Sequence, residues 1–354
     1  MLVTQVFWPD SDETYENDLT KINHSPQYAN KRFCNDWDQT GHVSINDMAA
    51  MAWNYIFEEK LSMPDSTLPS KQINIDRFNH PNKDQLSVSW LGHSSLLITI
   101  DGYRVLTDPV FEKYVSLLGP TRYCGDVPVD IDEMPQIDAV VISHNHHDHF
   151  SKYSIQRLNE KTNLFFVPLA VGSRLLHWGV PKDKIIEMDW WEEFRIDPNL
   201  RIAATPAQHF SGRSLTDQNR TLWSSWVIEG PSHNVFFSGD TGYFEGFKTI
   251  GKKYGPFDMT FLECGAYDES WHRVHMFPEQ AVQAHIDLKG KLLHPIHWGT
   301  FKLAFHPWFE PMERLLNAAD HSEVHALTPI IGETSVFGEP ALASKWWEKI
   351  VSKN

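Results

Sequence analysis

Hydrophobic positions divide the chain into a polar N-terminal part and a longer part with dense apolar runs. Residues 1–80 are rich in Asn, Asp and Ser, and one helix is predicted there from Ile45 to Lys60, where apolar residues recur at helical spacing. About 80 polar residues would form a weak core by themselves. We therefore expect 1–80 to be an extension packed on a main domain that spans 81–354.

From Leu86 onward, short apolar or alternating runs predict strands, with helical patterns between them. Asp101-Gly102 predicts a hairpin turn, and Pro278 stands where a helix prefers proline, in its first turn. This mixture predicts an α/β (α+β) domain with two sheets and helices outside them. The predicted strands are 87–92, 95–100, 103–107, 137–143, 164–168, 201–205, 222–229, 234–238, 259–263 and 291–296, and the predicted helices are 153–159, 171–178, 278–288 and 312–319.

Composition and charge narrow the class of protein. Of the 354 residues, 41% are hydrophobic, no run approaches the roughly 20 apolar residues of a membrane helix, and the N-terminus lacks a secretory pattern. We therefore expect a soluble, cytoplasmic protein, in which Cys34, Cys124 and Cys264 are reduced thiols without a CxxC pair. The net charge of −15 weighs against a nucleic-acid partner held by phosphate contacts.

The densest group of chemically active side chains follows the predicted strand 137–143. His144, His146, Asp148 and His149 lie within six positions, at the carboxyl end of that strand. Imidazoles and a carboxylate crowded together are poorly satisfied without a cation. The alternative is an exposed loop that is merely rich in histidine. We expect a metal site.

Three distant residues, each just after a predicted strand, complete this site. They are His209, Asp240 and His297, and glycines on either side of Asp240 allow a tight turn. Five histidines and two aspartates are too many for one zinc, which prefers four ligands. Two metal ions that share an aspartate and a hydroxide would use all seven. Zinc is favoured, and iron or manganese stays open because both accept His and Asp ligands.

Several motifs resemble those of one enzyme family. They are Trp90-Leu-Gly-His-Ser, Leu106-Thr-Asp-Pro-Val-Phe, Gly239-Asp-Thr-Gly-Tyr and Ile296-His-Trp-Gly-Thr-Phe. With the His-x-His-x-Asp-His segment, they resemble the N-acylphosphatidylethanolamine-hydrolysing phospholipase D family and its bacterial relatives, within the metallo-β-lactamase superfamily. The resemblance runs from about Leu86 to about Thr334 and implies an αββα sandwich with two Zn²⁺ per chain.

The resemblance also implies a role for each site residue. Asp108 would orient a ligand histidine from outside the metal site, and His93 would lie near the site. Asp240 would bridge the two zinc ions. One zinc would be held by His144, His146 and His209, and the other by Asp148, His149 and His297.

A hydrolytic mechanism follows from these roles. A metal-bridging hydroxide, held in line by Asp148, would attack the substrate. His275 would stabilise the phosphoryl oxygens or protonate the leaving group; the alternative is that it caps or packs at the helix starting at Pro278. His275 matches a histidine of the mammalian phospholipases, whereas Val274 stands where they carry a glutamine and His147 where tyrosine is common. These departures affect substrate contacts and not metal ligands.

The substrate and partners are expected from the same resemblance. The favoured substrate is an N-acylphosphatidylethanolamine-like lipid or related phosphodiester, and the alternatives are a lactone or carboxylic ester, or a small nucleotide. A metal-binding module without catalysis and a redox di-iron protein are rival classes; di-iron relatives typically place Glu where His146 stands. The resemblance suggests a homodimer, and peripheral contact with a membrane stays open.

Overall fold

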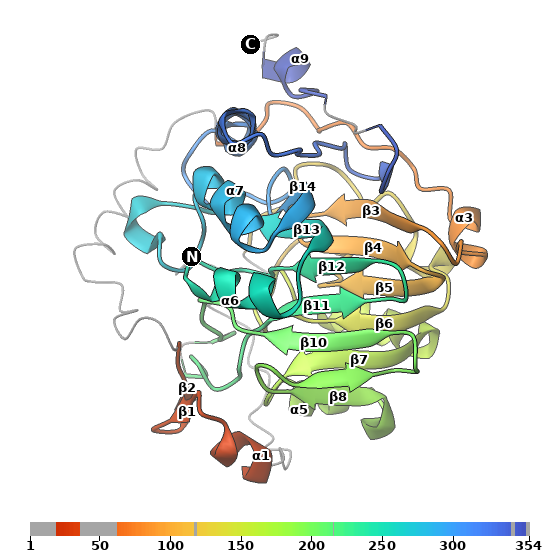
Figure 1. The fold of residues 1–354 in the computed structure, drawn as a ribbon, viewed down its shortest axis with the longest axis vertical. Coiled ribbons are helices and arrows are strands. Elements are labelled where there is room, and N and C mark those ends of the chain that lie inside the picture. Colours follow the sequence, from red (N-terminus) through yellow and green to blue (C-terminus); the bar gives the residue numbers. More distant parts are fainter. Residues whose placement is uncertain (1–18, 36–61, 117–118, 215, 341–343, 352–354) are drawn as a thin grey trace.

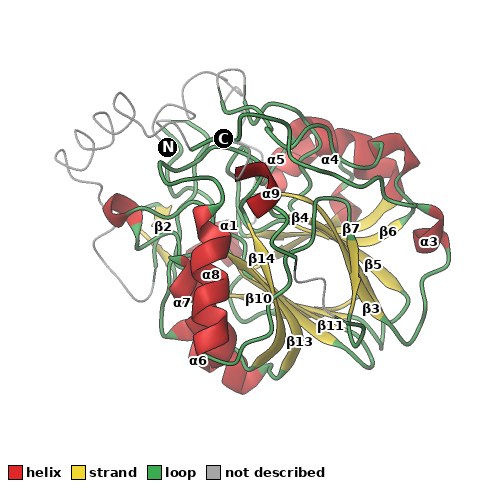
Figure 2. Cartoon of the chain, turned by 90° about the horizontal axis from the view of Figure 1, so that it is seen from above, coloured by secondary structure: helices red, strands yellow, loops and turns green. Residues whose placement is uncertain are grey.

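The computed structural model describes residues 19–35, 62–116, 119–214, 216–340 and 344–351. The helix predicted at Ile45–Lys60 lies outside these ranges. Two large sheets form the centre of the molecule, and helices cover their outer faces (Figure 1, Figure 2). The expected αββα sandwich is confirmed.

The first sheet has seven strands and the second has six. Each sheet contains both antiparallel and parallel pairs of strands. The first sheet runs in the order β15 (Thr334–Val336), β3 (Leu86–Gly92), β4 (Ser95–Ile100), β5 (Tyr103–Thr107), β6 (Ile137–Val141), β7 (Thr162–Pro168) and β8 (Ile185–Met188). The second runs in the order β14 (Gly290–Ile296), β13 (Phe257–Glu263), β12 (Asn234–Phe237), β11 (Ser225–Glu229), β10 (Arg201–Thr205) and β9 (Glu193–Arg195).

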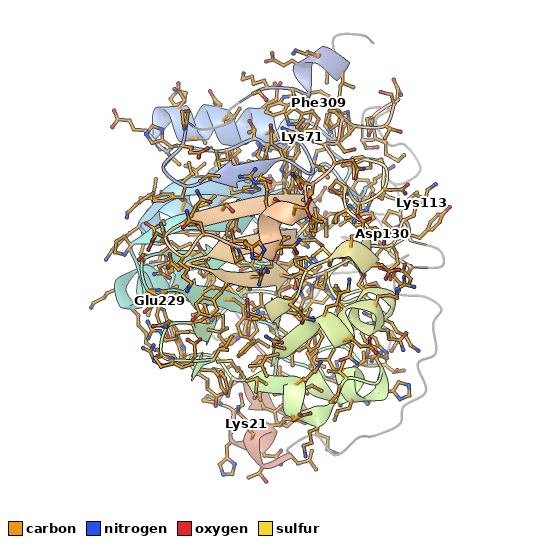
Figure 3. All side chains as sticks on the ribbon, turned by 90° about the vertical axis from the view of Figure 1, so that its right-hand side faces the viewer. Lys21, Lys71, Lys113, Asp130, Glu229 and Phe309 are labelled. Carbon is orange, nitrogen blue, oxygen red and sulfur yellow. The ribbon has the colours of Figure 1, made fainter. Side chains whose placement is uncertain are left out.

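Side-chain alternation explains how the sheets form layers. On β4, Leu96 and Ile98 join the core between the sheets, whereas Leu97 between them joins the core under the outer helices. Side chains fill the spaces between the layers (Figure 3). The helices are α3 (Asp76–Asn79), α4 (Lys152–Leu158), α5 (Gly172–His177), α6 (Gly246–Lys253), α7 (Pro278–Asp287), α8 (Glu310–His321) and α9 (Glu348–Val351), besides α1 in the N-terminal segment.

The described N-terminal residues contact the sandwich. This segment contains α1 (Leu19–His24) and a small hairpin of β1 (Tyr28–Ala29) and β2 (Arg32–Phe33). Ile22 and Phe33 are buried against Trp190 and Trp223 of the main part of the chain. The division at residue 80 stays a prediction.

Where the structure differs from the predicted elements, packing or composition gives the reason. The strand predicted at 222–229 starts only at Ser225, because Leu222 and Trp223 pack against the N-terminal segment instead. The sequence pattern did not predict α6, which has two glycines in eight residues, or the edge strands β9 and β15, which have three residues each. Such short or glycine-containing segments carry too little pattern to be recognised.

We expect Phe236→Ala to lower the free energy of unfolding by about 3–5 kcal/mol, because Phe236 is fully buried under α6, where its ring lies beside that of Phe247, and its removal leaves a cavity. Urea denaturation measures this change. Leu19→Ala, at a largely exposed position, is the control. Equal unfolding midpoints for the two variants would contradict the assigned core.

Candidate metal centre

The seven predicted ligands lie on loops that follow strands of both sheets. Strand β6 leads to His144, His146, Asp148 and His149, and strands β10, β12 and β14 lead to the other three. Although the positions span from 144 to 297, the structure brings all seven side chains together in two groups. Their assignment as metal ligands stays a prediction, which the atomic distances below support.

The first group contains His144, His146, His209 and Asp240, all of which are buried. His144 Nε2 and His209 Nε2 lie 2.8 and 3.3 Å from His146 Nδ1. The same two Nε2 atoms lie 3.8 and 3.7 Å from Asp240 Oδ2. A tetrahedral zinc with bonds of about 2.1 Å separates its ligand atoms by about 3.4 Å. These four atoms therefore lie at separations that suit one such ion.

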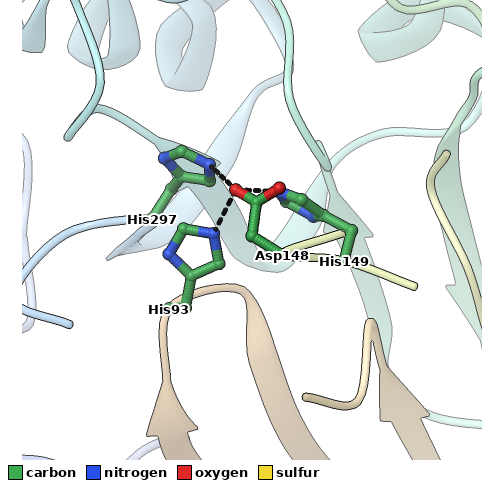
Figure 4. A group of neighbouring side chains, drawn as sticks. All are labelled: His93, Asp148, His149 and His297. Atoms are coloured by element: carbon green, nitrogen blue, oxygen red, sulfur yellow. Dashed lines mark hydrogen bonds and ion pairs between the residues drawn. The ribbon is translucent and has the colours of Figure 1, made fainter. Parts of the chain in front are cut away.

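The second group forms around the other oxygen of Asp240. Asp240 Oδ1 lies 3.2 Å from His149 Nε2 and 3.1 Å from His297 Nε2. Asp148 Oδ2 lies 3.6 Å from each of these two nitrogens. Figure 4 shows the Asp148 carboxylate facing His149 and His297. Asp240 thus offers one oxygen to each group, as a bridging ligand would.

Unmet hydrogen-bonding capacity also fits bound cations. His149 Nε2, His297 Nε2 and Asp240 Oδ1 are buried and have no hydrogen-bond partner among the described residues. Orphaned buried polar atoms are rare because each costs free energy. A metal ion between them would satisfy these atoms, so the residues fit the group that the sequence predicts.

Burial and neighbouring charges give the histidines of the two groups different pKa values. Burial, together with neighbouring histidines, holds the pKa of His144 and His209 well below the usual value and lowers that of His146 to about 4. Burial also opposes charge on His297, but Asp240 and Asp148 outweigh it and raise the pKa of His297 to about 9. The three histidines of the first group are therefore neutral at pH 7, which is the form of histidine that binds metals.

Hydrogen bonds from outside the two groups fix the orientation of three histidine rings. His149 Nδ1 donates to Asp108 Oδ2 at 2.7 Å, and His209 Nδ1 donates to the carbonyl of Val274 at 3.0 Å. His144 Nδ1 lies 2.9 Å from Ser143 Oγ. Such contacts leave Nε2 of each ring free to bind a metal.

Asp108 is placed as the predicted orienting residue would be. It is fully buried, and it accepts hydrogen bonds from the backbone N–H of Ser143 at 2.7 Å and from Ser143 Oγ at 2.6 Å. One carboxylate therefore ties His149 to the start of the ligand loop. Asp108, His93 and His297 all have positive φ, a costly conformation for residues other than glycine that clusters at functional sites.

His93 contacts the second group directly. Its Nε2 lies 3.1 Å from Asp148 Oδ2, and its ring centroid lies 4.0 Å from that of His297 (Figure 4). Thr300 Oγ1 accepts its backbone N–H at 2.7 Å. Burial and the neighbouring His297 lower the pKa of His93 to about 3. The ring is close enough to bind a metal itself or to hold Asp148 in place.

His275 lies at the edge of both groups. It is fully buried, one of its ring nitrogens lies within 4.8 Å of ligand atoms of Asp240 and His297, and neither nitrogen has a hydrogen-bond partner among the described residues. The backbone N–H of Phe277, at the start of α7, donates to Gln280 Oε1 at 2.9 Å. The start of α7 is therefore capped by Gln280 and not by the His275 ring, so the ring is available to the site.

The sequence analysis missed Asn35, which reaches the site from the N-terminal segment. Its side chain donates to the carbonyl of His209 at 2.9 Å and accepts the His209 backbone N–H at 3.2 Å. The same oxygen accepts Trp223 Nε1–H at 3.1 Å. A lone asparagine in a polar stretch gave no signal for this contact.

Arg213 and Gly239 were missed as well. Arg213 donates to the carbonyls of Asn145 and Phe150 at 2.9 and 2.7 Å, and so holds both ends of the histidine-rich loop. Gly239 has φ +55°, and a Cβ there would lie 2.3 Å from Ser143 Cβ. Only glycine allows the loop that carries Asp240 to approach the loop that starts at Ser143.

We expect Asn35→Ala to weaken metal binding by about 10-fold, because contacts that orient ligands typically contribute that much or more. Competition with a chromogenic chelator measures the affinity. Asn23→Ala, an exposed asparagine on α1 of the same segment, is the matched control. Equal affinities for the two variants would show that the Asn35 contacts do not support the site.

Comparisons with known proteins agree with this geometry. A family model described as a β-lactamase superfamily domain matches residues 103–298. An uncharacterized protein of Mycobacterium tuberculosis is 42% identical over 331 residues, covering 91% of this chain and 87% of that protein. The N-acyl-phosphatidylethanolamine-hydrolyzing phospholipase D 1 of Caenorhabditis elegans is 34% identical over 277 residues, covering 73% and 76%.

Among solved structures, Igni18, a metallo hydrolase from the archaeon Ignicoccus hospitalis, has a similar fold. Its TM-score is 0.53 at 23% sequence identity, and the match covers 72% of this chain and 100% of that one. Within the described ranges, none of the helices combines the length and apolarity that crossing a membrane requires. By its family match, its relatives and its fold, the chain belongs to the metallo-β-lactamase superfamily and is a metal-dependent hydrolase.

Proposed function

We propose that this hydrolase is a phosphodiesterase of phospholipase D type that uses two zinc ions, with N-acylphosphatidylethanolamine-like lipids or related phosphodiesters as substrates. The observation that carries the proposal is the pair of ligand groups that share Asp240. A relative at 34% identity is named as a phospholipase D of this specificity, which supports the choice of bond.

Each ligand group would hold one ion. Two bound divalent ions polarise a phosphoryl oxygen and provide an ionised water near neutral pH. His144, His146 and His209 would hold one ion, and Asp148, His149 and His297 the other, with Asp240 between them. Zinc fits best because the ligands are nitrogen and oxygen at tetrahedral spacing; iron and manganese stay alternatives.

Asp148 has the geometry of a residue that orients the attacking water. Burial opposes its charged form, but His149, His297 and His93 outweigh that cost and hold its pKa well below the usual range. The carboxylate is therefore ionised at neutral pH and accepts hydrogen bonds. Because Oδ2 contacts His93 at 3.1 Å, the carboxylate is held in one orientation.

His275 would act on the leaving group. Water forms the new bond to phosphorus, the bond from phosphorus to the leaving oxygen breaks, and a proton from the His275 ring passes to that oxygen. The water's own proton is released to solvent, and the His275 ring regains a proton from solvent. The ring is buried next to both ligand groups and has unpartnered nitrogens, as this role requires.

Apolar rings beside the metal groups favour a substrate with a hydrophobic portion. The Phe301 centroid lies 5.2 Å from that of His93, and the Phe210 centroid lies 4.7 Å from that of His146. Phe301 packs with Val110 and Val115 in a small apolar cluster. Such walls suit an acyl chain better than a free nucleotide.

Protein purified without added metal should contain about two zinc ions per chain by elemental analysis, because the two ligand groups are preformed. It should hydrolyse bis(p-nitrophenyl) phosphate, and a chelator should abolish that activity. Two metals without this activity would move the search to lactones and carboxylic esters. Little or no bound metal would contradict the proposed centre itself.

Asp148→Asn should lower turnover of the same substrate by at least about 100-fold, since the amide cannot replace the charge and acceptor capacity of the carboxylate. Thermal unfolding should show that the protein still folds. Asp126→Asn, at an exposed position, is the control and should leave turnover unchanged. Wild-type turnover in Asp148→Asn would refute the role given to Asp148.

A further inference from the structure

Glu263 is a fully buried carboxylate at the carboxyl end of β13, next to the candidate metal centre. Removing an ionised carboxylate from water is costly unless hydrogen bonds or an opposite charge compensate for it. The metal-ligand groups do not include Glu263. Its contacts therefore indicate why a carboxylate is kept at this position.

One oxygen of Glu263 faces the loops that carry Asp240 and His275. Oε1 accepts the backbone N–H of Met276 at 2.9 Å and lies 3.5 Å from that of Thr241. These two residues directly follow His275 and Asp240 in the chain. Oε1 also lies 3.2 Å from His275 Nδ1.

Glu263 and His275 both keep buried polar atoms that make no hydrogen bond. Glu263 Oε2 and both ring nitrogens of His275 are buried without a hydrogen-bond partner among the described residues. The carboxylate of Asp101, which is also buried, differs: it accepts two backbone N–H groups and His233 Nδ1 in a turn far from the site. Both carboxylates face an imidazole, but Asp101 has hydrogen bonds to both of its oxygens, whereas Glu263 keeps one oxygen unpartnered beside a ring whose nitrogens are also unpartnered.

We propose that Glu263 is a positioning residue that orients His275 for the reaction. By accepting Nδ1–H, the carboxylate would fix the ring and direct Nε2 toward the phosphoryl group and its leaving oxygen. Its negative charge would compensate for charge on a ring that donates to that group. The inference rests on the phosphodiesterase function proposed above and adds a residue to it.

The decisive experiment is a double-mutant cycle with an N-acylphosphatidylethanolamine, because its alkoxide leaving group needs a proton, whereas the p-nitrophenolate of bis(p-nitrophenyl) phosphate does not. Glu263→Gln keeps an oxygen for the Met276 N–H but removes the charge. We expect kcat to fall by about 10-fold to 100-fold, with KM within about twofold of wild type. The double variant with His275→Ala should be no slower than His275→Ala alone, because the two residues act as a unit.

A second readout does not require turnover. Inorganic phosphate should bind the zinc-loaded protein more weakly in Glu263→Gln and in His275→Ala, and the two losses should not add. The absorption spectrum of the cobalt(II)-substituted protein should match wild type in Glu263→Gln, because Glu263 is not a ligand. A changed spectrum would assign Glu263 to the metal shell and overturn the inference.

Asp258→Asn is the matched control. Asp258 is buried at the other end of β13 and accepts Asn234 N–H and Lys291 Nζ–H at 2.9 and 2.8 Å. Its variant should keep wild-type kcat and phosphate affinity. If Glu263→Gln does not fold, Glu263→Asp replaces it in the cycle, because it preserves the charge. Glu263→Asp should lower kcat in the protein that carries His275 and should have no further effect in the His275→Ala variant.

The outcomes separate this inference from the proposed function. Wild-type values in Glu263→Gln, with a strong effect of His275→Ala, would overturn the positioning role and leave the phosphodiesterase intact. Additive losses in the cycle would reduce Glu263 to a structural contact. If wild type does not hydrolyse the phosphodiester, the proposed function fails, and phosphate binding still decides whether Glu263 and His275 are coupled.

Discussion

The sharing of Asp240 between two groups of buried imidazoles is the constraint on which the rest of the structure depends. Burial raises the cost of its charge, and His149 and His297 offset that cost, so that the pKa of Asp240 lies well below its usual range. Each oxygen of Asp240 can contact its own group of imidazoles only if loops from the two sheets meet at one edge of the sandwich. The sheet topology meets this requirement, because β6, β10, β12 and β14 each end just before candidate ligand residues.

Hydrogen bonds from residues around the candidate ligands keep that arrangement in one geometry. Asp108 holds His149, the Val274 carbonyl holds His209, and Asn35 holds the backbone of His209. Three site residues with positive φ show that the surrounding packing imposes the conformation on the backbone. Strain of this kind persists only where the neighbouring structure is rigid, and the dense apolar core between the sheets provides that rigidity.

Apolar runs predicted two sheets with helices outside, and clustered histidines and aspartates predicted one metal site of seven residues, for different reasons. The division of that site into two ligand groups came from the family resemblance. Central strands carry long apolar runs, so β10 was predicted with its observed bounds, whereas the three-residue edge strands had no comparable pattern. Candidate ligands such as His144 stand directly after strands and cluster with residues of the same chemistry. Glu263 also ends a strand, but as a single carboxylate it resembled an ordinary strand terminus. Asn35 acts on a residue far along the chain, which no local pattern can reveal.

The extent of the first sheet has a consequence for where this domain can be divided. The family match begins at residue 103, where β5 starts, yet β3 and β4 precede it and β15 follows its end at 298. These three strands form one side of the seven-stranded sheet and bury Trp90 and Ile98 against the other sheet. The span that the family model matches is therefore smaller than the span that builds the first sheet. A fragment cut at the recognised limits would expose the interior of the sandwich to water.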